Sequence, residues 1–185
     1  MIKKNIILVL CLYCFATGIV FSAESHNELY YKRQIQNQRF AYGSSGLLNA
    51  IQKGRIDVVK MFINAGYNMN DTWAGYPIIF YALQEKEYEI FEIMLQAGAN
   101  PNTIVAGKSL LHHSIYYKDS TLVNILIKNK ADINLVSDKK TPLNFAITKK
   151  QTKIVDILLK AGAKLDTTTE ALLQKSEDEY LKSLF

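Results

Sequence analysis

Cysteine is nearly absent from this 185-residue chain, which has only Cys11 and Cys14, both close to the N-terminus. They lie in an apolar segment that we expect to be removed, so we do not interpret their C-x-x-C spacing as a redox motif. A bacterial lipoprotein signal would place a small residue just before the modified cysteine, but Leu10 and Tyr13 stand there. The sequence therefore argues against lipidation and leaves no cysteine for chemistry in the rest of the chain.

Histidine is also scarce, with His26, His112 and His113 as the whole set. Neighbouring residues of a helix point about 100° apart, so His112 and His113 cannot easily share one metal ion. Nucleophilic catalysis needs a base and an orienting group near a serine or cysteine, and no such constellation stands out. The sequence predicts no metal, no cofactor and no enzyme activity.

Two short motifs resemble parts of catalytic sites but fit simpler explanations. The stretch Ala-Gly-Lys-Ser at 106–109 looks like the end of a phosphate-binding loop, yet Asn102 stands where that loop needs its first glycine. No apolar strand leads into it either. The stretch Gly-Ser-Ser-Gly at 43–46 fits a flexible entry to a helix with a serine N-cap. An enzyme site built across several units is the least favoured interpretation.

Neither sign of charge is in large excess. The chain has 22 basic and 17 acidic residues, a net charge of +5 at pH 7. Lys3 and Lys4 lie in the segment expected to be removed; without them, 20 basic residues stand against the same 17 acidic ones, and the net charge is +3. This excess is too small to predict a nucleic-acid partner.

The N-terminus has the pattern of a secretory signal peptide. Residues 1–5 contain two lysines, and residues 6–21 contain no charged side chain. That run is short for a membrane span, which normally needs about 20 apolar residues. We expect a signal peptide over residues 1–23, cut after Ser22 or Ala23, with an earlier cut near Ala16 and Gly18 as the alternative, and an exported protein that is periplasmic or secreted. An uncleaved membrane anchor is the alternative.

What the sequence does contain is an internal repeat of 32 residues, in four consecutive units: 45–76, 77–108, 109–140 and 141–166. Several register positions recur in every unit. They include the series Leu47, Ile79, Leu111 and Leu143, the series Gly66, Gly98, Lys130 and Gly162, and the series Asn70, Asn102, Asn134 and Asp166. A fixed period of this length indicates a solenoid or an array, in which neighbouring units bury each other's apolar faces.

Each unit is predicted to form two short helices. Ser45, Ser109 and Thr141 are placed to cap the first helix, because a hydroxyl oxygen can accept a hydrogen bond from a free backbone N–H. The second helix carries apolar residues at helical spacing, as over residues 154–159 of the fourth unit. The glycine that follows, as in Ala-Gly-Ala at 161–163, ends this helix in a left-handed conformation.

These units resemble the ankyrin repeat. The positions that match its pattern are Thr141-Pro142-Leu143, Ala146, Ile154-Val155, Ile157-Leu158-Leu159, Gly162-Ala163 and Asp166, with Leu111-His112, Gly98-Ala99 and Asn102 in other units. The chain departs from the family by a unit one residue short, by Pro77 at a capping position and by Lys130 at a terminal glycine. The resemblance implies an all-α repeat solenoid of ankyrin-type helix-turn-helix units linked by short β-hairpin loops.

The repeat domain, residues 45–166, is flanked by two segments that we expect to cover its ends. Residues 24–44 are polar with loosely spaced apolar residues, and they are predicted to form an N-terminal cap or linker. Residues 167–185 carry leucines among charged side chains, and they are predicted to form a C-terminal capping helix that shields the last unit.

In ankyrin domains the hairpin tips and the exposed side of the first helices form a concave surface that binds partner proteins. The resemblance places aromatic and basic side chains on that surface here. Tryptophan and tyrosine bury a large area at modest entropic cost, which favours them as interface anchors. An alternative for Trp73 is that it folds back onto Met69 and Tyr76. The predicted partner-binding residues are Trp73, Tyr76, Lys108, Tyr116, Tyr117, Lys140 and Lys149.

Together these features predict a monomeric, non-catalytic protein–protein interaction module. Its expected partner is another protein, with no role for nucleic acid and none for a membrane unless the signal segment stays attached. By analogy with exported ankyrin proteins, its role would be masking, immunity or scaffolding. The alternative is a secreted effector that docks onto a component of a host cell.

Overall fold

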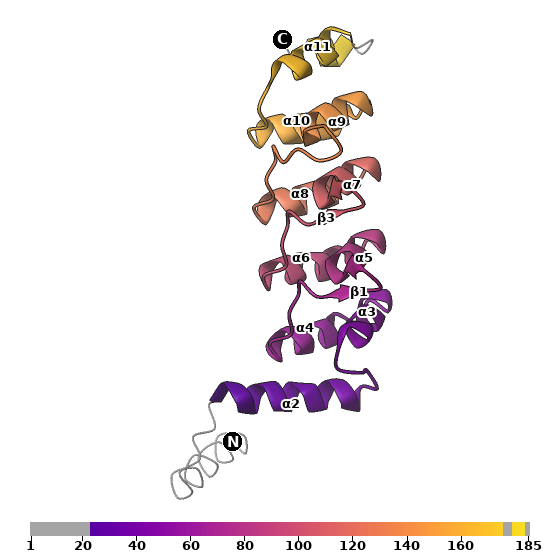
Figure 1. Ribbon diagram of the computed structural model, residues 1–185, viewed down its shortest axis with the longest axis vertical. Helices are drawn as coiled ribbons and strands as arrows, with labels where there is room; N and C mark the ends of the chain where they lie inside the picture. The colour runs from indigo at the N-terminus through magenta and orange to yellow at the C-terminus, as the bar shows by residue number, and fades with distance from the viewer. Residues whose placement is uncertain (1–22, 176–178, 184–185) are drawn as a thin grey trace, which may run out of the picture.

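The fold is a column of stacked helix pairs with further helices at both ends (Figure 1). The computed structural model describes residues 23–175 and 179–183, so the expected signal segment lies outside the described residues apart from Ala23. None of the helices in this described part is long and apolar enough to cross a membrane.

The column has two layers, one for each helix of the repeat (Figure 1). The inner helices are α3 (Ser44–Gln52), α5 (Ile78–Gln84), α7 (Leu110–Tyr116) and α9 (Pro142–Thr148). The outer helices are α4 (Ile56–Asn64), α6 (Tyr88–Gln96), α8 (Ser120–Lys128) and α10 (Thr152–Lys160). Each inner helix packs against the outer helix of its own unit, and each helix also packs against its equivalent in the next unit. The chain is therefore an all-α repeat solenoid.

Serine and threonine caps start two of the inner helices, as predicted. The Ser109 hydroxyl oxygen accepts a hydrogen bond from the backbone N–H of His112 at the start of α7. The Thr141 oxygen accepts one from the backbone N–H of Asn144, and Pro142 occupies the first turn of α9. These bonds satisfy backbone donors that the helix itself leaves free.

The prediction that Ser45 caps the first inner helix is wrong. The N-cap of α3 is Gly43, which forms no side-chain capping bond, and Ser45 lies inside the helix. The preceding loop folds back over the helix start so closely that a Cβ atom on Gly46 would lie 1.7 Å from the carbonyl oxygen of Ala41. This backbone approach requires glycine at position 46 and sets the entry to the helix.

The outer helices end in a left-handed residue. Gly66, Gly98 and Gly162 have φ angles of 69°, 96° and 89° at this position. Lys130, where the sequence departs from the glycine pattern, adopts the same conformation with φ of 63°. The turn is thus kept in the third unit at the cost of strain that glycine would not carry.

Apolar side chains from successive units form one continuous core. The recurring buried series are Phe62, Met94, Leu126 and Leu158 from the outer helices and Leu47, Ile79, Leu111 and Leu143 from the inner helices. Complete burial of such a side chain stabilises the fold by about 1.5–3 kcal/mol relative to leaving it in water. Neighbouring units supply much of this cover, so each unit depends on the next.

Short hairpins connect the units. The antiparallel pairs are β1 (Thr72–Trp73) with β2 (Tyr76–Pro77) and β3 (Ile104–Val105) with β4 (Lys108–Ser109). In the next hairpin, Ser137 and Lys140 form a single bridge. The two turn residues have positive φ in all three hairpins, at 74–75, 106–107 and 138–139, as type I′ turns require.

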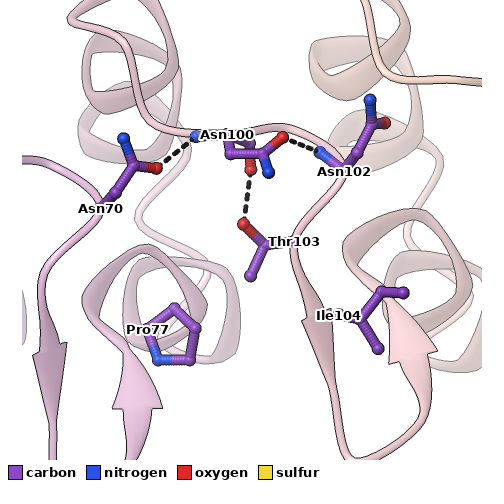
Figure 2. Close-up of a pocket in the computed structure, with 6 residues that line it drawn as sticks. All are labelled: Asn70, Pro77, Asn100, Asn102, Thr103 and Ile104. Atoms are coloured by element: carbon purple, nitrogen blue, oxygen red, sulfur yellow. Dashed lines mark hydrogen bonds between the residues drawn. The ribbon is translucent and has the colours of Figure 1, made fainter.

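A ladder of asparagine side chains ties successive units together on the loop that follows each outer helix. The bonds run from the backbone N–H of Asn100 to Asn70 Oδ1, of Asp132 to Asn102 Oδ1 and of Lys164 to Asn134 Oδ1, at 2.7, 2.7 and 2.8 Å. Figure 2 shows the first of them. At the fourth register position Asp166 accepts a bond from the backbone N–H of Thr169 at 2.7 Å, and so caps the terminal helix instead.

The two ends of the column are covered. At the N-terminal end α2 (Ala23–Asn37) packs against α4, and Ile35 and Phe40 are buried there. At the C-terminal end the single predicted capping helix is replaced by α11 (Thr167–Gln174) and α12 (Glu179–Lys182). Leu173 and Leu181 are both buried, and α11 ends at Gln174 with Lys175 as its C-cap, so two short helices cover the last unit.

We predict that Asn102→Ala lowers the free energy of unfolding by about 1 kcal/mol, because the backbone N–H of Asp132 loses its partner. Urea denaturation followed by far-ultraviolet circular dichroism measures the change. Asn124→Ala, at an exposed position of α8, serves as the matched control and should be close to neutral. Equal stability of the two variants would contradict the role given to the ladder.

Candidate functional site

The hairpins lie against the inner helices, and together they present one surface that we call the inner face. β1 contacts α3, β2 contacts α5 and β4 contacts α7. The face consists of Trp73, Tyr76, Phe80, Lys108, His113, Tyr116, Tyr117, Lys140, Phe145 and Lys149. All seven side chains predicted for partner binding belong to the hairpins or to the C-terminal ends of inner helices.

Aromatic rings form a continuous track along this face, from Tyr76 at the end of repeat 1 through Phe80 in repeat 2 to His113, Tyr117 and Tyr116 in repeat 3. The ring centroids are 6.3 Å apart for Tyr76 and Phe80, 4.7 Å for Phe80 and His113, 6.3 Å for His113 and Tyr117, and 5.7 Å for Tyr117 and Tyr116. Tyr76, Tyr116 and Tyr117 keep 46%, 56% and 36% of their surface exposed. The track therefore offers apolar area that the fold itself does not use.

Three members of this face were not among the predicted site residues. Phe80 and Phe145 are 6% and 5% exposed and form its floor, while the half-buried His113 lies between Phe80 and Tyr117. The repeat register holds the signal that could have found two of them. His113 and Phe145 follow Tyr81 at intervals of 32 residues, so one aromatic position of the inner helix recurs in three units.

Trp73 lies at the edge of the inner face, on the hairpin of the first connection. Its backbone carbonyl accepts a hydrogen bond from the Tyr81 hydroxyl at 3.0 Å, which fixes the strand to α5. The indole is 40% exposed. Trp73 is paired with Tyr76 across the hairpin, so the two side chains belong to the same hairpin tip.

The three lysines predicted for binding have different surroundings. Lys108 forms an ion pair with Asp138 at 3.1 Å. Lys149 lies over two rings, 5.7 Å from the centroid of Tyr116 and 5.5 Å from that of Phe145. The ammonium group of Lys140 is 3.5 Å from the Thr148 hydroxyl. Lys149 thus extends the aromatic track into repeat 4, with Lys140 beside it.

His112 positions the next hairpin rather than binding a ligand. Its Nε2 donates to the backbone carbonyl of Lys140 at 3.1 Å, and its Nδ1 lies 2.8 Å from the hydroxyls of both Ser109 and Ser137. The ring is fully buried, and burial lowers the pKa of His112 below its ordinary value. The neutral ring can donate at Nε2 and accept at Nδ1, which suits all three partners.

His113 is held in a similar way. Its Nε2 donates to the Val105 carbonyl at 3.0 Å, which joins α7 to the preceding hairpin. Burial is the main cause that lowers the pKa of His113, and the nearby charge of Lys108 lowers it further. The imidazole therefore belongs to the aromatic track as a neutral ring.

The arrangement of exposed rings and lysines offers a surface for a partner. Among the described residues no group of three or more His, Cys, Asp or Glu side chains could hold a metal ion. One hollow is lined by Asn70, Pro77, Asn100 and residues 102–104 (Figure 2). The Asn70 amide there is already bonded at both ends, to the Gly98 carbonyl at 2.9 Å and to the Asn100 N–H. This hollow therefore lies between loops that the asparagine ladder joins, and the polar groups of Asn70 in it already have partners.

The fold and this surface define the chain as a repeat solenoid that carries the aromatic track on its inner face. A family model described as ankyrin repeats (3 copies) matches residues 19–105 and again residues 102–169. The chain therefore belongs to the ankyrin repeat family, whose members generally act as non-catalytic modules for protein–protein interaction. A search of curated proteins finds no match.

We predict that the protein is less stable at pH 5.5 than at pH 7.5. The pKa of both His112 and His113 is lowered in the folded state, so the unfolded chain binds protons first. Their contribution to the free energy of unfolding is complete above the unfolded pKa of about 6.5. It is lost as the pH falls from there towards the lower pKa values of the folded state. Asp57, Asp138 and Asp166, whose pKa values are lowered, stay charged throughout this range.

Urea denaturation at the two pH values tests this prediction, with His113→Gln as the comparison. Glutamine does not titrate, so the variant should show a smaller difference between pH 7.5 and pH 5.5 than the unmodified chain. A protein that is more stable at pH 5.5, or a difference that the variant leaves unchanged, would contradict the assignment.

Proposed function

We propose that this protein is exported and that it binds another protein through its inner face, in a masking, immunity or scaffolding role. Membership of the ankyrin repeat family supports the binding of a protein partner. The observation that carries the choice of surface is the aromatic track, which spans three repeats and whose Tyr76, Tyr116 and Tyr117 rings remain exposed. Exposed aromatic clusters of this kind are enriched at interface centres.

The geometry also supports binding without large rearrangement. The hairpins and inner helices that carry the track are fixed by buried bonds, such as those of His112 to Lys140 and to Ser137. A preorganised surface loses little conformational entropy when a partner docks. The proposed mechanism is therefore steric, in which the bound partner is covered or held in place and no bond is made or broken.

The proposal of export rests on the first 23 residues, with their lysine-containing start and uncharged run. A secreted effector would share this segment and differ only in its destination, outside the producing cell. Both versions place the folded repeats beyond the cytoplasmic membrane.

We predict that the combined variant Trp73→Ala, Tyr116→Ala and Tyr117→Ala loses affinity for the natural partner by about tenfold or more, because it removes the exposed ring area. The measurement is affinity capture from an envelope extract of the source cell, followed by titration with the captured protein. The matched control replaces three apolar side chains outside the inner face, Leu29, Tyr30 and Leu165, which are also well exposed. Capture that survives the first variant but not the second would show that the partner binds elsewhere.

We predict that the chain expressed in a Gram-negative host is recovered outside the cytoplasm with its N-terminus at Ala23 or Glu24. Mass spectrometry of the intact protein reads the cut, and fractionation into periplasm and medium separates a resident protein from a secreted one. Leu10→Arg interrupts the apolar run and should keep the uncut chain inside the cell. An uncut chain in the cytoplasm of cells expressing the unmodified sequence would refute the export proposal.

A further inference from the structure

Charge is divided unevenly along the column. Residues 45–108, which form repeats 1 and 2, contain five basic and six acidic side chains. Residues 109–166, which form repeats 3 and 4, contain ten lysines and five aspartates, a net charge of +5. The C-terminal half of the repeat domain therefore attracts anions, although the chain as a whole is only mildly basic.

Part of this charge lies on the inner face without a carboxylate partner. Lys108 is paired with Asp138, and on the outer helices Lys128 pairs with Glu92 and Lys60 with Glu89, at 2.6 and 3.7 Å. Among the described residues, Lys140 and Lys149 form no ion pair; their contacts are the Thr148 hydroxyl and the rings of Tyr116 and Phe145. Lys149 thus lies over Tyr116, the most exposed ring of the track, and Lys140 lies on the hairpin of Asp138, whose carboxylate is already paired with Lys108.

The charge on this face also has a direction. The residue after each inner helix is Lys53, Glu85, Tyr117 and Lys149 in repeats 1 to 4. Glu85 lies in repeat 2, near the start of the aromatic track, and Lys149 lies at its end in repeat 4. Over repeats 2 to 4 a bound segment would therefore meet an acidic side chain at one end and two lysines at the other.

We propose that repeats 3 and 4 bind an acidic segment of the partner protein, with its carboxylates at Lys140 and Lys149 and its apolar side chains on Tyr116 and Tyr117. This inference rests on the proposed function and specifies the chemistry of the partner. Complementary charge would speed the encounter and set the direction of the segment, while the rings supply the buried apolar area.

Two other occupants fit the surface less well. Nucleic acid would need a broad cationic surface, but among the described residues the inner face offers only two lysines outside an ion pair. Glu85 after α5 and Asp138, the partner of Lys108, add negative charge next to it. A second copy of this chain could offer the acidic residues 177–179, a case that the self-association outcome of the test covers, or its acidic run at Glu85–Glu92. Glu89 and Glu92 of that run are already paired with Lys60 and Lys128.

The test uses the purified full chain and a library of displayed random peptides, followed by titration of the most enriched peptide. We expect enrichment of peptides that combine aspartate or glutamate with a large apolar residue, and affinity that falls as the salt concentration rises. The same peptide with asparagine and glutamine in place of its acidic residues should bind about tenfold more weakly. A single-stranded oligonucleotide of equal charge is the comparison for simple attraction of anions.

The matched variants are Lys140→Gln with Lys149→Gln and, as control, Lys160→Gln with Lys164→Gln, which remove the same charge outside the inner face. Only the first pair of substitutions should lower the affinity for the acidic peptide, by about tenfold. The assignment would be overturned by an equal loss of peptide affinity in both double variants or by an oligonucleotide that binds as tightly as the acidic peptide. Self-association of the chain that competes with the peptide would overturn it as well.

The outcomes separate this inference from the proposed function. Enriched peptides without acidic residues that still depend on Trp73, Tyr116 and Tyr117 would leave the inner face as the binding surface and refute the acidic partner. Enriched peptides that depend on neither the aromatic nor the lysine residues would refute both.

Discussion

The whole structure depends on the burial of each unit's apolar stripe by its neighbours. A unit of 32 residues has two short helices, which are too small to enclose side chains such as Phe62 or Phe91 on their own. Stacking solves this because the inner and outer helices of one unit pack on those of the next. The ends then need covers of their own, which α2 and α11 provide.

Because the core and the loops between units hold the column together, the inner face stays exposed to solvent. The core residues project into the column, and the asparagine ladder fixes the loops after the outer helices. The exposed sides of the inner helices and hairpins contribute little to this packing. Their side chains can therefore vary with the partner while the fold stays the same, which is the physical basis for a binding module.

Buried polar residues connect the packing of the core with the position of the inner face. His112 belongs to the interior of repeat 3, yet its bond to the Lys140 carbonyl sets the hairpin that carries Lys140 to the inner face. Ser137 contributes to the same link through its hydroxyl. The position of the exposed surface is thus determined by contacts that a partner never touches, and loss of these contacts would loosen the face without removing any of its side chains.

The repeat register was enough to predict the solenoid, the helix pairs and the left-handed ends of the outer helices, because each depends on residues that recur at a fixed spacing. Lys130 shows that packing from neighbouring units can impose a turn on a residue that does not favour it. Ser45 was assigned wrongly because the helix start in repeat 1 depends on the loop at Ala41, which belongs to no repeat.

The inner face could be predicted only in part. The hairpin tips and helix ends were placed by the family resemblance, but the roles of Phe80 and Phe145 as its floor depend on contacts between units. Similarly, the ion pair of Lys108 with Asp138 and the contact of Lys140 with the Thr148 hydroxyl depend on distances between side chains of different hairpins and helices. Sequence spacing within one unit carries no information on such distances.

The most direct test of the account is hydrogen–deuterium exchange of the chain alone and in complex with its captured partner. The account predicts slower exchange in the complex along the inner face, over residues 104–117 and 137–149, with no change in the outer helices α8 and α10. Protection confined to the outer helices or to α2, with the inner face unchanged, would contradict it.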